Sequence, residues 1–173
     1  MIRVTVTGSE CTGKTTLAEA VAEHYGTVAV PEYVRRFVDE NQRAPKAADV
    51  DAIARGQIAL EESLADRAHR LMVLDTDLLS TLIYSRHYYG GTPGWIEERV
   101  RNRPADLYLL CDIDVPWSPD GSQRDRGDRR EEMQELFRRA LLGRNLPFIA
   151  LQGDPASRLD TAISAIDDLL KRA

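Results

Sequence analysis

Apolar residues recur along the chain in two patterns, and the two patterns alternate from one end to the other. Short apolar or alternating runs are typical of strands, and apolar residues three or four positions apart are typical of helices. Strands are predicted at residues 2–7, 27–30, 71–75, 105–111 and 147–151. Helices are predicted at residues 14–25, 48–70, 78–88, 95–102, 133–141 and 159–170, with Gly143 expected to end the fifth of them. This alternation indicates an α/β fold, with a five-stranded parallel sheet and helices on both faces.

The size and composition of the chain favour one soluble domain that covers residues 1–173. The chain is 43% hydrophobic and 29% charged, and its formal net charge is −5. That charge argues against nucleic acid as a partner, because no broad basic excess is present to neutralise phosphates. The sequence shows no signal peptide or membrane-spanning run, and its two cysteines form no disulfide or zinc pattern. We therefore expect a cytoplasmic protein that binds neither membranes nor nucleic acid.

The segment between the first strand and the first helix matches the phosphate-binding P-loop, G-x-x-x-x-G-K-[ST], at residues 8–15. Its two glycines let the backbone wrap a phosphate group. Lys14 places a positive charge against the β- and γ-phosphates, and the Thr15 hydroxyl is a ligand for Mg²⁺. The helix that begins here adds the positive end of its dipole. The residues predicted to bind ATP are Gly8, Glu10, Cys11, Thr12, Gly13, Lys14, Thr15 and Thr16.

The third predicted strand carries a second signal for a phosphate site. Four apolar residues lead into Asp75. A buried parallel strand that delivers a carboxylate beside a P-loop is the Walker-B pattern. Asp75 is therefore predicted to hold Mg²⁺ together with Thr15. Asp77, two positions further on, either caps the next helix or faces the substrate.

Two more polar residues are candidates for the site. Glu32 follows the second predicted strand, at the edge of the sheet where open α/β folds bind ligands. It is either a catalytic base or substrate ligand, or an acid favoured at a helix start by the helix dipole. Gln57 lies inside the predicted helix at 48–70, and its place in the sequence alone favours a surface position.

An arginine-rich segment follows the fourth predicted strand. A proline- and glycine-containing loop carries Trp117 and Asp120, and a mixed-charge run with Arg124 and Arg126 comes after it. Such a run is either a solvated helix face or a lid that brings guanidinium groups onto the transferring phosphoryl group. The lid is the favoured interpretation, because phosphoryl transfer at a P-loop needs such a cationic partner.

Taken together, these motifs resemble the nicotinamide riboside (ribosylnicotinamide) kinase domain of NadR-type NAD-biosynthesis proteins, within the P-loop kinases. The resemblance covers nearly the whole chain, and the P-loop kinase class implies the strand order 2-3-1-4-5. It rests on the P-loop and on residues 31–36, Gln57, residues 75–77 and residues 117–121. In that family the kinase follows an adenylyltransferase domain, and sometimes a DNA-binding domain as well. Neither of those activities is expected here, because the sequence carries no counterpart of either domain.

The resemblance also implies an acceptor site. Its members would be Glu32, Tyr33, Arg36, Gln57, Asp77, Trp117 and Asp120. Trp117 would stack on the pyridinium ring of the substrate, and Asp120 would accept hydrogen bonds from the ribose hydroxyls.

The same resemblance assigns the catalytic groups. Lys14 and the lid arginines, Arg124 and Arg126, would stabilise charge on the transferred phosphoryl group. Nucleoside kinases of related fold use a carboxylate after the second strand as the base. This favours Glu32 and leaves Asp75 and Asp77 as alternatives.

The sequence therefore predicts ATP- and Mg²⁺-dependent phosphorylation of the 5′-hydroxyl of nicotinamide riboside, giving nicotinamide mononucleotide and ADP. Two alternatives stay open. One is a kinase for another nucleoside or ribosyl compound, and the other is a regulatory ATPase that switches a partner. The P-loop does not separate the three. The sequence does not determine the oligomeric state.

Overall fold

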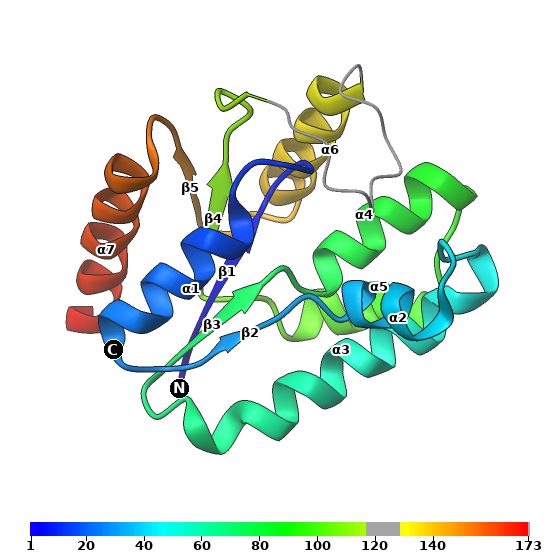
Figure 1. The fold of residues 1–173 in the computed structure, drawn as a ribbon, viewed down its shortest axis with the longest axis horizontal. Helices are drawn as coiled ribbons and strands as arrows, with labels where there is room; N and C mark the ends of the chain where they lie inside the picture. The colour runs from blue at the N-terminus through cyan, green and yellow to red at the C-terminus, as the bar shows by residue number, and fades with distance from the viewer. Residues whose placement is uncertain (117–128, 173) are drawn as a thin grey trace.

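A five-stranded parallel sheet forms the centre of the protein, and the P-loop leaves it from the middle strand (Figure 1). The computed structural model describes residues 1–116 and 129–172. The strands are β1 (Ile2–Thr7), β2 (Ala29–Val30), β3 (Leu71–Asp75), β4 (Leu107–Cys111) and β5 (Phe148–Leu151). The α-helices are α1 (Lys14–Tyr25), α2 (Tyr33–Asn41), α3 (Val50–Leu64), α4 (Leu78–Tyr89), α5 (Gly94–Asn102), α6 (Arg130–Gly143) and α7 (Pro155–Arg172), with short 3₁₀ turns at Ala47–Asp49 and Ala65–Arg67.

The strands are ordered β2-β3-β1-β4-β5. The order 2-3-1-4-5 expected for a P-loop kinase is therefore confirmed. β1 pairs with β3 on one side and with β4 on the other, and Val6 lies opposite both Asp75 and Leu109. This register brings the P-loop and Asp75 to the same edge of the sheet, since all five strands run in one direction.

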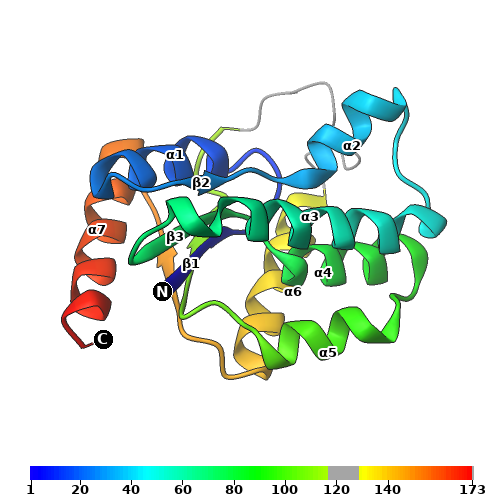
Figure 2. The same cartoon turned by 90° about the horizontal axis from the view of Figure 1, so that it is seen from below.

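Helices cover both faces of the sheet (Figures 1 and 2). α1 and α7 pack on one face over Val4, Val6 and Leu109, and α3, α4, α5 and α6 lie on the other. The residues of β4 divide between the two faces of the sheet. Leu109 belongs to the core under α1 and α7, whereas Tyr108 and Leu110 belong to the core under α4 and α6. Alternate residues of a strand point to opposite faces, so a strand buried on both sides is apolar throughout.

Three features of the helices differ from the predictions. α2 was not among the predicted helices. The predicted helix at 48–70 is shorter as an α-helix, because 3₁₀ turns replace its first and last turns. Gly143 does not end α6 in a left-handed conformation; it is the last helical residue, and the positive φ of 52° falls on Asn145.

No helix in the described part of the chain is both long and apolar enough to cross a membrane.

Candidate phosphate and acceptor site

The P-loop has the backbone geometry that its glycines predict. Gly8 has φ 128°, and a Cβ there would lie 2.7 Å from the Cys111 carbonyl oxygen, so a larger residue does not fit. Gly13 has φ 79° and stands directly before α1. Cys11 also adopts a positive φ, of 53°, which is uncommon for a residue with a side chain.

The inner side of the loop is organised around the Ser9 carbonyl oxygen. It accepts hydrogen bonds from Lys14 Nζ at 2.7 Å and from Thr12 Oγ1 at 2.9 Å. On the neighbouring strand, Asp75 Oδ2 accepts a hydrogen bond of 2.6 Å from Thr15 Oγ1. The structure thus brings together the two residues that the P-loop and Walker-B motifs predict as partners, although 60 positions separate them in the chain.

Thr15 and Asp75 also fit a metal ion. Asp75 is buried, and its Oδ1 has no hydrogen-bond partner among the described residues. Oxygen donors of this kind are what Mg²⁺ prefers, and it usually keeps several waters and binds substrate phosphates in addition. Residues 1–116 and 129–172 contain no cluster of three or more His, Cys, Asp or Glu side chains that could enclose a metal alone. An ion at Thr15 and Asp75 would therefore depend on phosphate and water ligands.

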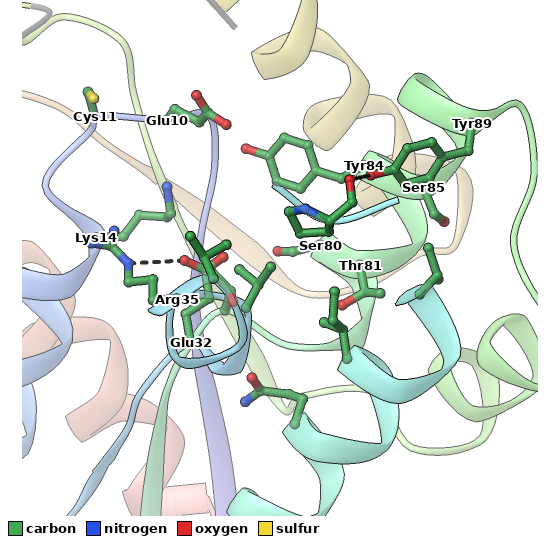
Figure 3. A pocket seen from close by; sticks show the side chains of 17 residues that line it. Glu10, Cys11, Lys14, Glu32, Arg35, Ser80, Thr81, Tyr84, Ser85 and Tyr89 are labelled. Carbon is green, nitrogen blue, oxygen red and sulfur yellow. Dashed lines mark hydrogen bonds and ion pairs between the residues drawn. The ribbon is translucent and has the colours of Figure 1, made fainter. Parts of the chain in front are cut away.

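A pocket opens from the P-loop toward α4 (Figure 3). At one end lie Glu10, Cys11 and Lys14, and at the other lie hydroxyl and aromatic side chains of α4. Its lining consists of Glu10, Cys11, Lys14, Glu32, Val34, Arg35, Val38, Pro45, Val50, Ile53, Gln57, Thr76, Ser80, Thr81, Tyr84, Ser85 and Tyr89. One pocket thus joins a phosphate-binding loop to a partly apolar chamber with polar groups, which is the usual character of a small-molecule site.

Glu32 lies between these two ends. Its side chain is 19% exposed and pairs with Arg35 at 3.2 Å. Burial raises the pKa of Glu32, the nearby Lys14 lowers it, and Asp75 raises it further, so that the net direction is upward. Glu32 precedes α2 directly but makes no side-chain capping bond to it. The structure therefore places this carboxylate in the pocket and gives it no capping hydrogen bond.

Gln57 is buried, with 3% of its surface exposed, so the surface position that sequence alone favours is wrong. Its Oε1 accepts a hydrogen bond of 2.8 Å from the backbone N–H of Tyr33. That bond fixes the carboxamide, and the buried Nε2 has no hydrogen-bond partner within the described ranges. Since Gln57 lines the pocket, it can offer this donor to a ligand.

Three predicted acceptor residues do not line the pocket. Asp77 caps α4, because its Oδ1 accepts from Leu79 N at 3.0 Å, while its Oδ2 accepts from the Tyr108 hydroxyl at 3.0 Å. Burial raises the pKa of Asp77 to about 6, and the Glu61 carboxylate adds to the rise. Of the two alternatives for Asp77, the structure thus shows the cap.

Tyr33 and Arg36 are turned away for different reasons. The Tyr33 ring packs against Gly56 of α3. Arg36 is 64% exposed and pairs with Glu40 on the same helix, whereas its neighbour Arg35 lines the pocket. Trp117, Asp120, Arg124, Arg126 and the proposed lid lie outside the described residues.

Sequence reasoning missed the contribution of α4. Ser80, Thr81, Tyr84 and Ser85 all face the pocket (Figure 3). Their spacing of one, three and one residues is that of neighbours on one helix face. The same helix contributes Leu79 and Leu82 to the core. Its second face, with three small hydroxyl residues and a tyrosine, is a pattern from which a ligand-facing surface could have been predicted.

Residues 3–158 match a family model described as "AAA domain". The chain belongs to this AAA-domain family. Among its relatives is the trifunctional NAD biosynthesis/regulator protein NadR of Escherichia coli, which is 27% identical over 155 residues. That match covers 86% of the present chain but 38% of NadR. The chain thus spans less than half the length of this relative.

Two solved structures share the fold of this AAA-domain chain. NadR in complex with NR has a TM-score of 0.75 at 24% identity, covering 96% of the chain and 50% of that protein. NadR in complex with NAD and AMP-PNP has a TM-score of 0.74 at 25% identity, covering 96% and 49%. These matches confirm both the α/β P-loop fold and the resemblance to NadR-type proteins.

Proposed function

We propose that the chain is an ATP-dependent kinase that phosphorylates the 5′-hydroxyl of nicotinamide riboside. One observation carries the proposal: a P-loop with its Thr15–Asp75 pair opens into the same pocket as the partly buried carboxylate of Glu32. A phosphate site beside a candidate base, with room for a second molecule, is the arrangement that phosphoryl transfer needs. A site for hydrolysis alone would not need the chamber lined by α3 and α4.

ATP is the donor that the site and its relatives support. The P-loop backbone and Lys14 fit a polyphosphate, and a NadR protein binds AMP-PNP. Thr15 and Asp75 are the residues that would hold Mg²⁺, which when bound would neutralise negative charge on the phosphates. Lys14, now held by the Ser9 carbonyl oxygen, is within the pocket that the phosphates would enter.

Nicotinamide riboside is the acceptor that similarity to NadR supports, since a NadR protein binds NR. The far end of the pocket suits a ribosyl compound with a flat ring. It offers hydroxyl groups from Ser80, Thr81 and Ser85 beside the rings of Tyr84 and Tyr89. The Gln57 amide adds a fixed donor. Trp117 and Asp120 stay predictions for the same chamber.

In this proposal the chain's groups divide the work. Glu32 orients the acceptor hydroxyl and takes its proton as that oxygen attacks the γ-phosphorus. Lys14 stabilises the charge that spreads over the transferred phosphoryl group. Asp75 and Thr15 would hold the Mg²⁺ ion. The lid arginines Arg124 and Arg126 are expected to complete the cationic surround.

The acceptor is identified by measuring ADP release from ATP and Mg²⁺ with nicotinamide riboside, adenosine, cytidine, thymidine or uridine, and without any acceptor. We expect stimulation by nicotinamide riboside, with nicotinamide mononucleotide detected by mass spectrometry. Stimulation by a different nucleoside would keep the kinase and replace the substrate. Slow ADP release that no acceptor stimulates would overturn the proposal in favour of a regulatory ATPase.

Replacement of Lys14 tests the reaction itself. Lys14→Ala is expected to lower kcat on the order of 10³-fold or more, the scale of cationic contacts to a transferring phosphoryl group. Lys171→Ala is the matched control, because Lys171 is exposed and pairs with Asp168 far along α7. Near-normal turnover by Lys14→Ala would contradict the proposed site.

A further inference from the structure

The outer side of the P-loop is bound by an arginine that the catalytic proposal does not use. Arg158 of α7 is 4% exposed. Its Nη1 donates to the Thr12 carbonyl oxygen at 2.7 Å, its Nη2 to the Asp112 carbonyl oxygen at 3.0 Å, and its Nε to the Gly153 carbonyl oxygen at 3.0 Å. It also forms an ion pair with Asp114. One guanidinium group therefore joins the P-loop to the loops that follow β4 and β5.

A second arginine binds the preceding peptide of the loop. Arg130, the first residue of α6, donates from Nη2 to the Cys11 carbonyl oxygen at 2.9 Å and from Nη1 to the Val115 carbonyl oxygen at 2.8 Å. Gln134, one turn further along α6, accepts from Ser9 N at 3.0 Å and donates to the Cys111 carbonyl oxygen at 2.9 Å. Two helices from opposite faces of the sheet thus hold successive peptide groups of the P-loop.

These contacts determine where two backbone N–H groups point. A peptide unit is planar and trans, so the N–H of one residue points opposite to the carbonyl of the residue before it. The described chain contains no cis peptide bond. With the Cys11 and Thr12 carbonyls turned toward Arg130 and Arg158, the N–H groups of Thr12 and Gly13 point the other way. Neither N–H has a hydrogen-bond partner among the described residues.

The local backbone has the form of an anion-binding concavity. Cys11 and Gly13 have positive φ angles of 53° and 79°, and Thr12 lies between them. Successive N–H groups in turns that include left-handed residues converge and bind anions. In addition, each guanidinium group places a positive charge beside a backbone carbonyl, and the N–H of the same peptide unit points away from that arginine.

We propose that Arg130 and Arg158 are positioning residues that aim the Thr12 and Gly13 N–H groups at the phosphates of the nucleotide without contacting the phosphates themselves. The inference rests on the proposed function only in requiring that the loop binds a polyphosphate. It differs from a role for lid arginines, because both residues act through backbone carbonyls. A phosphate would then meet amides that are already oriented, so no reorganisation of the loop is needed on binding.

Lysine substitutions separate orientation from charge. Lysine keeps the positive charge but is a point donor and lacks the planar fork of arginine. Arg158→Lys and Arg130→Lys are therefore expected to leave one or more of the bridged carbonyls without a partner. Arg144→Lys is the matched control, since Arg144, directly after α6, likewise donates to a carbonyl oxygen, that of Ala140 at 3.3 Å, and pairs with Glu97 away from the P-loop.

The test measures binding of tripolyphosphate, ATP and adenosine to each variant by calorimetry, with thermal unfolding as the check on folding. We expect Arg158→Lys and Arg130→Lys to weaken tripolyphosphate and ATP by about 10- to 100-fold, the scale of a charge-assisted hydrogen bond. Adenosine affinity is expected to stay unchanged, because adenosine offers no phosphate to the loop. A purely structural role would lower the unfolding temperature and affect adenosine as much as ATP.

Folded variants that bind tripolyphosphate as tightly as the natural chain would overturn the inference. If Arg158→Lys does not fold, Arg130→Lys and Arg130→Met decide the question. Arg130 makes fewer hydrogen bonds to backbone carbonyls than Arg158 does, so its loss is less of a threat to folding. Failure of the proposed function would look different. The natural chain would then phosphorylate no acceptor, while the comparison of tripolyphosphate affinities would still stand.

Discussion

Glu32 combines a position in the pocket with an environment that suits proton transfer. It lines the pocket together with Lys14 and pairs with Arg35. Burial raises the pKa of Glu32, Lys14 opposes the rise, and Asp75 supports it. A carboxylate that is less acidic than usual is, in its ionised form, a better proton acceptor. At the scale of single residues, this is the strongest candidate for the base.

Glu32→Gln is expected to lower kcat by about 10²- to 10⁴-fold, the usual contribution of a general base, and to leave ATP affinity unchanged. Only the ionised form of Glu32 accepts a proton. Because its pKa is raised, kcat/KM for the acceptor should fall as pH drops through a value above the ordinary range of glutamate. A pH profile of kcat/KM measures this fall, and the fall should be absent in Glu32→Gln.

Glu40→Gln serves as the control for that prediction, since Glu40 lies on the same helix, is 52% exposed and pairs with Arg36. Retention of the natural acid-side fall in Glu32→Gln would assign the base to another carboxylate.

The two ends of the pocket were not equally predictable from the sequence. The phosphate end depends on contiguous residues, so the motif predicts the glycine conformations and the Thr15–Asp75 contact. At the acceptor end, the choice between Arg35 and Arg36 depends on how α2 is rotated, which no motif specifies. Likewise, the buried Gln57 accepts a hydrogen bond from Tyr33 of another helix, and a contact between two helices is invisible in the pattern of either one.

At the scale of elements, buried strands were easier to predict than the short helix beside the site. β1 and β3 agree with their predicted ranges, because runs of apolar residues between two layers of helices have one simple explanation. α2 has only nine residues, of which only Phe37 is buried, so its own apolar face does not determine where it packs. Its position is fixed instead by contacts with α3, above all the packing of Tyr33 against Gly56.

Gly56→Ala tests whether that packing holds the pocket wall in place. A Cβ at position 56 would lie 2.1 Å from Cε1 of Tyr33, so the ring has to move and α2 with it. Although alanine normally favours a helix interior over glycine, we expect the substitution to lower the free energy of unfolding by about 1–3 kcal/mol, as overpacking does. The acceptor KM should rise, because Val34 and Arg35 of α2, and Glu32 directly before it, line the pocket.

Gly143→Ala is the matched control, since nothing lies within 4 Å of a Cβ placed there and its φ is not positive. It should leave stability unchanged or raise it slightly. Urea unfolding compares the two variants. Stabilisation by Gly56→Ala with an unchanged KM would show that the ring moves freely and that α2 is held by other contacts.

At the scale of the whole molecule, a buried polar network connects elements that are distant in the sequence. Arg3 of β1 pairs with Glu61 of α3 at 2.9 Å, and the two side chains are 11% and 8% exposed. The backbone N–H of Arg3 donates to Asp106, just before β4. Asp77 lies close enough for Glu61 to raise its pKa and for Arg3 to lower it. The network lies one helical turn along α3 from Gln57 and makes no contribution to the pocket lining.

A double-substitution cycle on Arg3 and Glu61 measures what this network contributes. Arg3→Met or Glu61→Leu alone leaves one buried charge without its partner, and each should lower the free energy of unfolding by about 3–5 kcal/mol. The double variant replaces both charges with apolar groups and should recover much of that loss, because a buried ion pair gains little over a well-packed apolar pair. Urea unfolding gives the four free energies, and the exposed Asp168–Lys171 pair, expected to show no measurable coupling, is the reference.

Tripolyphosphate binding by the double variant should match the natural chain, since the network does not contact the P-loop. Additive losses from the two single substitutions would mean that Arg3 and Glu61 stabilise the fold independently and not through each other.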